Sequence, residues 1–90
     1  MEFAELRDRG QRSLIDFLQV DLQLAHTLLE TAKLEAGYDS DHCRHALRTA
    51  ETAVSTVRQF AERVENESAR LDILNRADVL QRAITRFVDL

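Results

Sequence analysis

Gly37-Tyr38-Asp39-Ser40-Asp41 is the only sharp break in a chain of 90 residues that contains no proline. Long stretches of helix-forming sequence lie on both sides of it. Glycine adopts the left-handed conformation that follows many helix ends without steric cost, and aspartate and serine are preferred at helix starts. The break predicts one helix that ends at Gly37 and a second that begins near Asp41, with Tyr38 packed back on Ala32. So short a connection makes the two helices antiparallel neighbours.

The helix before the break is predicted from about Ser13, as its N-cap, to Ala36, because apolar residues recur at the helical period. The stripe consists of Ile15, Leu18, Leu22, Ala25, Leu29, Ala32 and Ala36. It is widened by Leu14, Phe17, Leu24 and Leu28. An arc of about half the circumference should contact two neighbouring helices. Residues 1–12 are predicted to be an N-terminal arm or a frayed helical turn.

Two further helices are predicted, over residues 41–65 and 68–89. The first of them has the cleanest apolar stripe, rich in small residues that allow a close partner, at Cys43, Ala46, Leu47, Ala50, Ala53, Val54, Val57, Phe60, Ala61 and Val64. The break between these helices is expected near Asn66, and the alternative is a break near Asn75. We therefore predict an all-α antiparallel three-helix bundle, with residues 13–90 as a single domain.

Part of this pattern is similar to a known repeat. Ala46, Ala50 and Ala53 have the spacing that lets a preceding helix pack closely, and Leu28-Leu29-Glu30-Thr31-Ala32 stands where that first helix would be. Over roughly residues 25–57 the chain resembles a single tetratricopeptide-type helical hairpin. It departs from the family at Ala50, where an aromatic residue is expected, in a longer connecting turn, and in having no closing proline. The resemblance implies a helical hairpin with protein-binding character.

Composition narrows the classes of function. The formal net charge is −4, which argues against a nucleic-acid binder and against a polybasic membrane-surface module. Cys43 is the only cysteine, so no internal disulfide forms, and we expect a cytoplasmic protein. No glycine-rich phosphate loop or paired nucleophile and base is present, so we expect neither an enzyme nor a cofactor.

The residues after the break hold the only cluster of metal-ligand side chains. His42 and His45 lie one helical turn apart, close to Asp39, and such groups can bind a transition metal. Cys43 lies between them but falls on the apolar stripe, so it is expected to be buried rather than to act as a ligand or nucleophile. Surface histidines without a metal are the simpler interpretation, and metal or small-ligand binding at His42, His45 and Asp39 is the alternative.

One charged residue interrupts the apolar arc of the first long helix. Asp21 lies inside the arc, where a carboxylate is costly to bury without a partner, and its neighbours there are Leu14, Phe17, Ala25 and Leu28. One interpretation pairs Asp21 with an arginine of another helix, Arg58 or Arg76. The other interpretation is a polar contact that specifies a binding partner or its register.

The breadth of the apolar arc favours an interaction protein. One neighbour cannot cover it, so Leu24 and Leu28, with Val20, Leu71 and Leu74, are expected to remain available to a protein partner or to a second copy of the chain. The partner-binding candidates are Leu24, Leu28, Asp21, Arg44 and Arg48, the two arginines for contact with an acidic partner. We predict a small non-catalytic module for protein–protein interaction or self-association, a homo-oligomer being expected.

Overall fold

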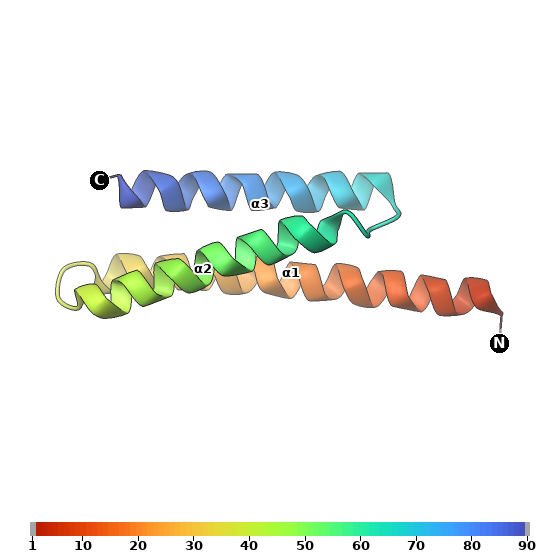
Figure 1. Cartoon of the computed structure of the whole chain (residues 1–90), viewed down its shortest axis with the longest axis horizontal. Coiled ribbons are helices and arrows are strands. Elements are labelled where there is room, and N and C mark those ends of the chain that lie inside the picture. Colours follow the sequence, from red (N-terminus) through yellow and green to blue (C-terminus); the bar gives the residue numbers. More distant parts are fainter. Residues whose placement is uncertain (1, 90) are drawn as a thin grey trace.

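The computed structural model describes residues 2–89 of the chain. It contains three helices, α1 (Phe3–Glu35), α2 (Ser40–Ala61) and α3 (Glu67–Val88), which run antiparallel to one another in chain order (Figure 1). The predicted all-α three-helix bundle is confirmed. The molecule is elongated, 55 × 20 × 15 Å, because α1 alone has 33 residues and a helix rises about 1.5 Å per residue.

The predicted helix start at Ser13 was wrong, because α1 begins ten residues earlier, at Phe3. Glu2 is the extended residue before the helix and has no capping side-chain hydrogen bond. Gly10 does not interrupt α1, since a single glycine within a helix costs only about 1 kcal/mol relative to alanine. Residues 3–12, expected as an arm or a frayed turn, are thus the first turns of α1.

Contacts with a distant part of the chain hold the start of α1 in place. The Gln11 side-chain amide donates to the carbonyl of Arg63 at 3.0 Å, and its oxygen accepts from the backbone N–H of Glu65 at 2.8 Å. One turn earlier, Arg7 Nε donates to the Glu65 carboxylate at 2.8 Å. These bonds join α1 to the connection between α2 and α3, and no local sequence pattern predicts them.

The turn between α1 and α2 differs from the predicted glycine cap. Gly37 does not have a positive φ, and the chain continues as a right-handed turn in which the N–H of Tyr38 and of Asp39 both donate to the Glu35 carbonyl, at 3.2 and 2.8 Å. The reversal occurs instead at Asp39, with φ −143° and ψ 87°. Asp39 caps α2, because its carboxylate accepts from the His42 N–H at 3.1 Å. Tyr38 is 78% exposed, so the predicted packing on Ala32 was also wrong.

Replacing Gly37 with alanine is therefore expected to stabilise the protein. A Cβ at this position meets no atom within 4 Å, the backbone conformation suits any L-residue, and alanine reduces the freedom of the unfolded chain. We expect the free energy of unfolding, from urea denaturation, to rise by about 0.4–1 kcal/mol. Gly10→Ala is the matched control in a helix interior and should give a similar gain. If Gly37→Ala lowered the free energy of unfolding while Gly10→Ala raised it, Gly37 would have the left-handed conformation after all.

The break between α2 and α3 lies near Asn66 as predicted, but α2 ends at Ala61, four residues before the predicted end at residue 65. Asn66 caps α3, and its side chain accepts from the Ala69 N–H at 2.8 Å, so α3 begins at Glu67. Asn75 lies inside α3, which rejects the alternative break. The side chain of Arg70 returns to the same connection and donates to the Val64 carbonyl at 3.0 Å.

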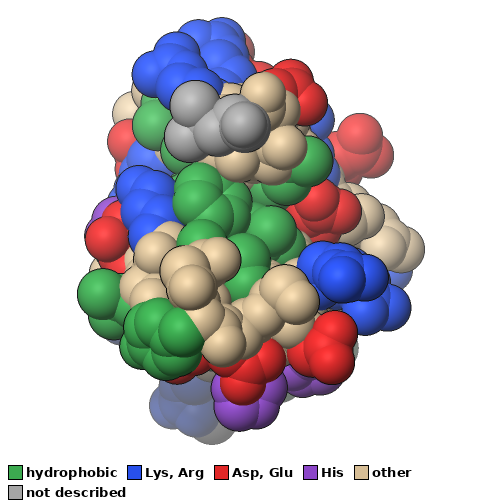
Figure 2. Space-filling model, turned by 90° about the vertical axis from the view of Figure 1, so that its left-hand side faces the viewer, with side chains coloured by type: hydrophobic (Ala, Val, Ile, Leu, Met, Phe, Trp, Pro, Cys, Tyr) green, Lys and Arg blue, Asp and Glu red, His purple; other side chains and the backbone are tan. Residues whose placement is uncertain are grey.

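The core lies where the three apolar stripes meet. Small residues of α2 face α1, and Ala46, Ala50 and Ala61 are buried, so the two helices approach closely. The main buried cluster comprises Leu18, Leu22, Ala25, Leu29, Ala50, Ala53, Val54, Val57, Ala61, Val64, Ile73, Ala77 and Ile84. At the end of the molecule that carries the α1–α2 turn, Figure 2 shows apolar side chains in the centre, surrounded by charged ones.

Candidate functional site

Helix α3 covers only one flank of the α1–α2 pair. A groove of about 270 Å³ between α1 and α3 is lined by Leu22 and His26 on one side and Leu80 on the other. On α2, Arg58 reaches α3 and lies 3.4 Å from the Asp78 carboxylate. These contacts identify which sides of α1 and α2 face α3.

The opposite flank of the pair is the open face, which we define by Leu14, Phe17, Asp21, Leu24 and Leu28 of α1 and Phe60 of α2. Leu24 lies about 180° around α1 from the side that faces α3, because successive residues are about 100° apart. By the same geometry Phe60 lies about 160° around α2 from Arg58. No element among residues 2–89 other than α1 and α2 contributes to this face.

The open face is apolar and partly exposed. Phe17 is 49% exposed and Leu24 is 46% exposed, while Leu28 and Phe60 are half-buried and pack against the core. Val20, at the edge of the face, is 66% exposed. The structure thus brings together three of the predicted partner-binding residues, Asp21, Leu24 and Leu28, and adds Phe17 and Phe60.

Asp21 is half-buried in the middle of this face. The predicted pairing with Arg58 or Arg76 was wrong, because Arg58 pairs with Asp78 and Arg76 lies 3.8 Å from Asp72 on its own helix. Within residues 2–89, the Asp21 side chain has no hydrogen bond and no ion pair. The one charge on the open face of α1 between Ser13 and Leu28 therefore has no internal partner.

The other predicted partner-binding residues lie elsewhere. Arg44 and Arg48 are exposed on the side of α2 opposite Ala46 and Ala50, away from the open face, and Arg44 is 4.0 Å from Asp41. Leu71 is 56% exposed on α3. These residues do not form one surface with Asp21 and Leu24.

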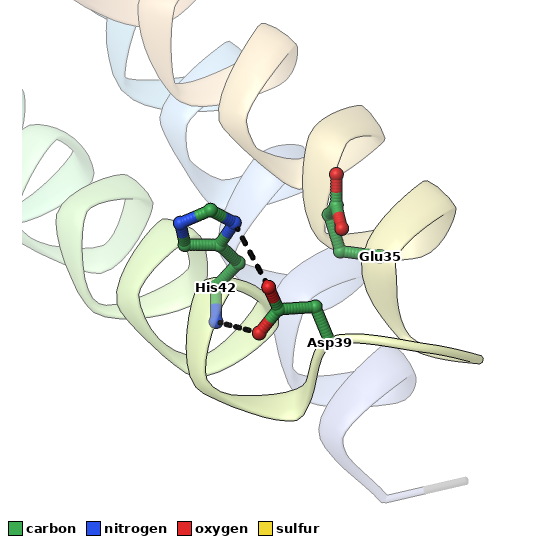
Figure 3. A group of neighbouring side chains, drawn as sticks. All are labelled: Glu35, Asp39 and His42. Atoms are coloured by element: carbon green, nitrogen blue, oxygen red, sulfur yellow. Dashed lines mark hydrogen bonds and ion pairs between the residues drawn. The ribbon is translucent and has the colours of Figure 1, made fainter.

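A second cluster forms at the α1–α2 turn, where ligand atoms of Glu35, Asp39 and His42 lie within 4.8 Å of one another (Figure 3). His42 Nδ1 is 3.2 Å from Asp39 Oδ2, while Oδ1 of Asp39 accepts from the His42 backbone N–H. Two of the predicted metal ligands, Asp39 and His42, are thus brought together. His45 and Cys43 are not part of this cluster.

Glu35 was missed as a candidate ligand. It is the last residue of α1, on the far side of the turn from the histidines, and the predicted ligand cluster comprised only residues after Gly37. Because the chain continues in a right-handed turn to Asp39, residues four apart approach as they do in a helix. The four-residue spacing from Glu35 to Asp39 was the sequence signal that could have identified Glu35 as a candidate ligand.

The electrostatics of this cluster favour capping over cation binding. The positive end of the α2 dipole attracts the Asp39 carboxylate and repels a metal ion placed beside it. Both Asp39 oxygens already have partners in His42. The cluster offers a metal three ligands at most, which are the Glu35 carboxylate, the Asp39 carboxylate that caps α2 and the exposed His42 imidazole.

Comparison with known proteins identified no relative of this chain. No protein-family model, no curated protein and no solved structure matches the chain. The tetratricopeptide-like pattern of residues 25–57 therefore stays a resemblance, although the helical hairpin that it implied is present as α1 and α2. Across residues 2–89, none of the helices combines the length and the apolar character that crossing a membrane requires.

Proposed function

We propose that this chain is a non-catalytic protein-interaction module that binds an α-helix on its open face. The observation that carries the proposal is the partly exposed apolar stripe of α1, Phe17, Leu24 and Leu28, on the flank that α3 leaves uncovered. An amphipathic helix laid into an apolar groove is a recurrent form of protein recognition.

The geometry of the face suits one helix. From Leu14 to Leu28 the stripe spans 14 residues of α1, a length of about 21 Å, or four turns. The open face is formed by two antiparallel helices, so a helix bound there would complete a four-helix bundle. Covering apolar side chains that are half exposed is favourable by about 25 cal/mol for each Å² removed from water.

The test is the binding of a designed helical peptide of about 20 residues, with leucine at every a and d position except a central glutamine. Amide chemical shifts of the labelled protein are expected to move most at Phe17, Leu24 and Leu28. Leu24→Glu should abolish the binding. Leu34→Glu is the matched control, because Leu34 lies on the same helix, is 72% exposed and is off the open face. Shifts confined to α3, or none, would contradict the proposal.

Self-association through the open face stays a prediction. It requires that the native mass from light scattering rises with concentration into the tens of micromolar, and that Leu24→Glu reverses the rise while Leu34→Glu does not. A monomeric mass for the unaltered chain over that range removes this form of the proposal and leaves binding to another protein.

Divalent metal binding at Glu35, Asp39 and His42 is the second candidate function. Its support is the approach of the three side chains from two helices and the turn. Weak binding is expected, because the α2 dipole opposes a cation. Zinc in excess should shift the His42 ring resonances, and His42→Ala should weaken binding by at least about tenfold, whereas His45→Ala should have no effect. Unchanged His42 resonances would remove this candidate.

A further inference from the structure

We infer that the helix accepted by the open face belongs to another protein and carries an arginine or lysine at the centre of its apolar stripe, where it pairs with Asp21. The inference rests on the proposed function and adds the chemistry of the partner. Its evidence is the position of Asp21, the charges around the face and the symmetry that a second copy would impose.

Asp21 lies at the centre of the stripe. It is seven residues from Leu14 and seven from Leu28, and seven residues are close to two helical turns, so all three lie on one side of α1. A helix that covers Phe17 and Leu24 must therefore also cover Asp21 and remove water from its carboxylate. A carboxylate buried without a partner is costly, and no group within residues 2–89 bonds to it.

The charge that α1 presents on this side is negative. Between residues 13 and 35 the only basic side chains are His26 and Lys33. His26 lines the groove toward α3, and Lys33 lies 3.2 Å from Glu30. Glu35 falls on the same side of α1 as Asp21, two heptads further along. A basic partner residue therefore meets attraction at both positions and no competing cation on the open side of α1 between residues 13 and 35, and Arg7, further toward the N-terminus, is paired with Glu65.

A basic group of the α2–α3 connection, Arg63, lies at one end of the open face, beside Phe60. Arg63 stacks over the Phe60 ring, 4.8 Å from its centroid, and the Gln11 bond to the Arg63 carbonyl fixes this end of α2 beside the first third of α1. Gln11 and Asp21 are ten residues apart, about 15 Å along the axis. Arg63 thus does not neutralise Asp21.

A second copy of the chain fits this face poorly. Because Asp21 is at the centre of the stripe, a two-fold arrangement that covers the stripe completely places Asp21 of one copy beside Asp21 of the other, in either helix direction. Two desolvated carboxylates repel each other, whereas shifting the register to separate them leaves Phe17 or Leu28 uncovered. The same charge that opposes self-pairing attracts a basic residue, and arginine adds bidentate hydrogen bonds to the carboxylate.

The test compares three peptides of about 20 residues that differ only in the central residue, which is arginine, glutamine or glutamate. With the unaltered chain, the arginine peptide is expected to bind at least about tenfold more tightly than the glutamate peptide, with glutamine between them. Added salt should reduce the difference. Asp21→Asn should reduce the preference to less than about threefold, and Asp21→Arg should reverse it. Asp16→Asn is the control, since Asp16 is exposed and lies off the open face.

Failure of the inference and failure of the proposed function give different results. Equal binding of all three peptides, mapped to Leu24, overturns the pairing with Asp21 and leaves a helix-binding face. No binding by any peptide overturns both. A chain that pairs with itself through Leu24 more tightly than it binds the arginine peptide also overturns the inference, since the occupant is then a second copy.

Discussion

Replacing Leu18 with alanine should lower the free energy of unfolding by about 3 kcal/mol, within the range of about 2–5 kcal/mol for such changes in cores. Leu18 has no exposed surface and lies in the cluster where all three helices meet. The loss combines the transfer of the removed methyl groups with the cavity left among neighbours that relax only partly. For a domain of this size each kcal/mol corresponds to roughly 4–8 °C in Tm, so thermal unfolding by circular dichroism should show a large shift.

The matched control for this change is Leu34→Ala. Leu34 lies on the same helix and is 72% exposed, so the same chemical change removes almost no buried contact. Its effect on the free energy of unfolding should stay within about 0.5 kcal/mol. If Leu18→Ala cost no more than Leu34→Ala, the packing of α1 against the other two helices would be incorrect.

Replacing Ala50 with leucine is the second large expected effect, from overpacking rather than from a cavity. Ala50 has no exposed surface, and it lies on the face of α2 that packs closely against α1. A larger side chain forces the helices apart or into strained rotamers, which costs about 1–3 kcal/mol. Urea denaturation should show a lower midpoint, and the distance between α1 and α2 should increase in solution measurements.

Ala36→Leu provides the comparison on an exposed position. Ala36 is exposed at the end of α1, so a leucine there tests side-chain size and helix propensity without any packing contact. We expect a change within about 0.5 kcal/mol. If leucine were tolerated at Ala50 as well as at Ala36, α1 and α2 would have to lie farther apart than in the structure.

The candidate site was only partly predictable. Leu24 and Leu28 followed from the breadth of the apolar arc, since periodicity alone shows that one neighbour cannot cover it. Whether Asp21 has a partner could not be predicted from the sequence, because that depends on which carboxylate Arg58 meets across the bundle. In the structure Arg58 meets Asp78. Glu35 was missed because its neighbours depend on the path of the turn.

The two errors in the fold, at the two ends of α1, have different causes. At Gly37 the rule for a left-handed cap is a preference, and a right-handed turn that transfers the reversal to Asp39 satisfies the same backbone groups. At the other end of α1, residues 3–12 have no apolar periodicity, so their helix depends on Arg7 and Gln11 bonding to the α2–α3 connection. Neither the path of the turn nor these long-range bonds can be read from a local sequence pattern.

The sequence by itself determined the number of helices, their antiparallel order, the apolar stripe of α2 and the break near Asn66. These features are local, because helical periodicity and capping act between residues at most four apart. Only the tertiary structure decided where α1 begins, which flank of the α1–α2 pair remains uncovered and whether Asp21 has a partner. Those outcomes depend on side chains far apart in the chain, such as Gln11 with Glu65 and Arg58 with Asp78, whose meeting is decided by how the helices pack.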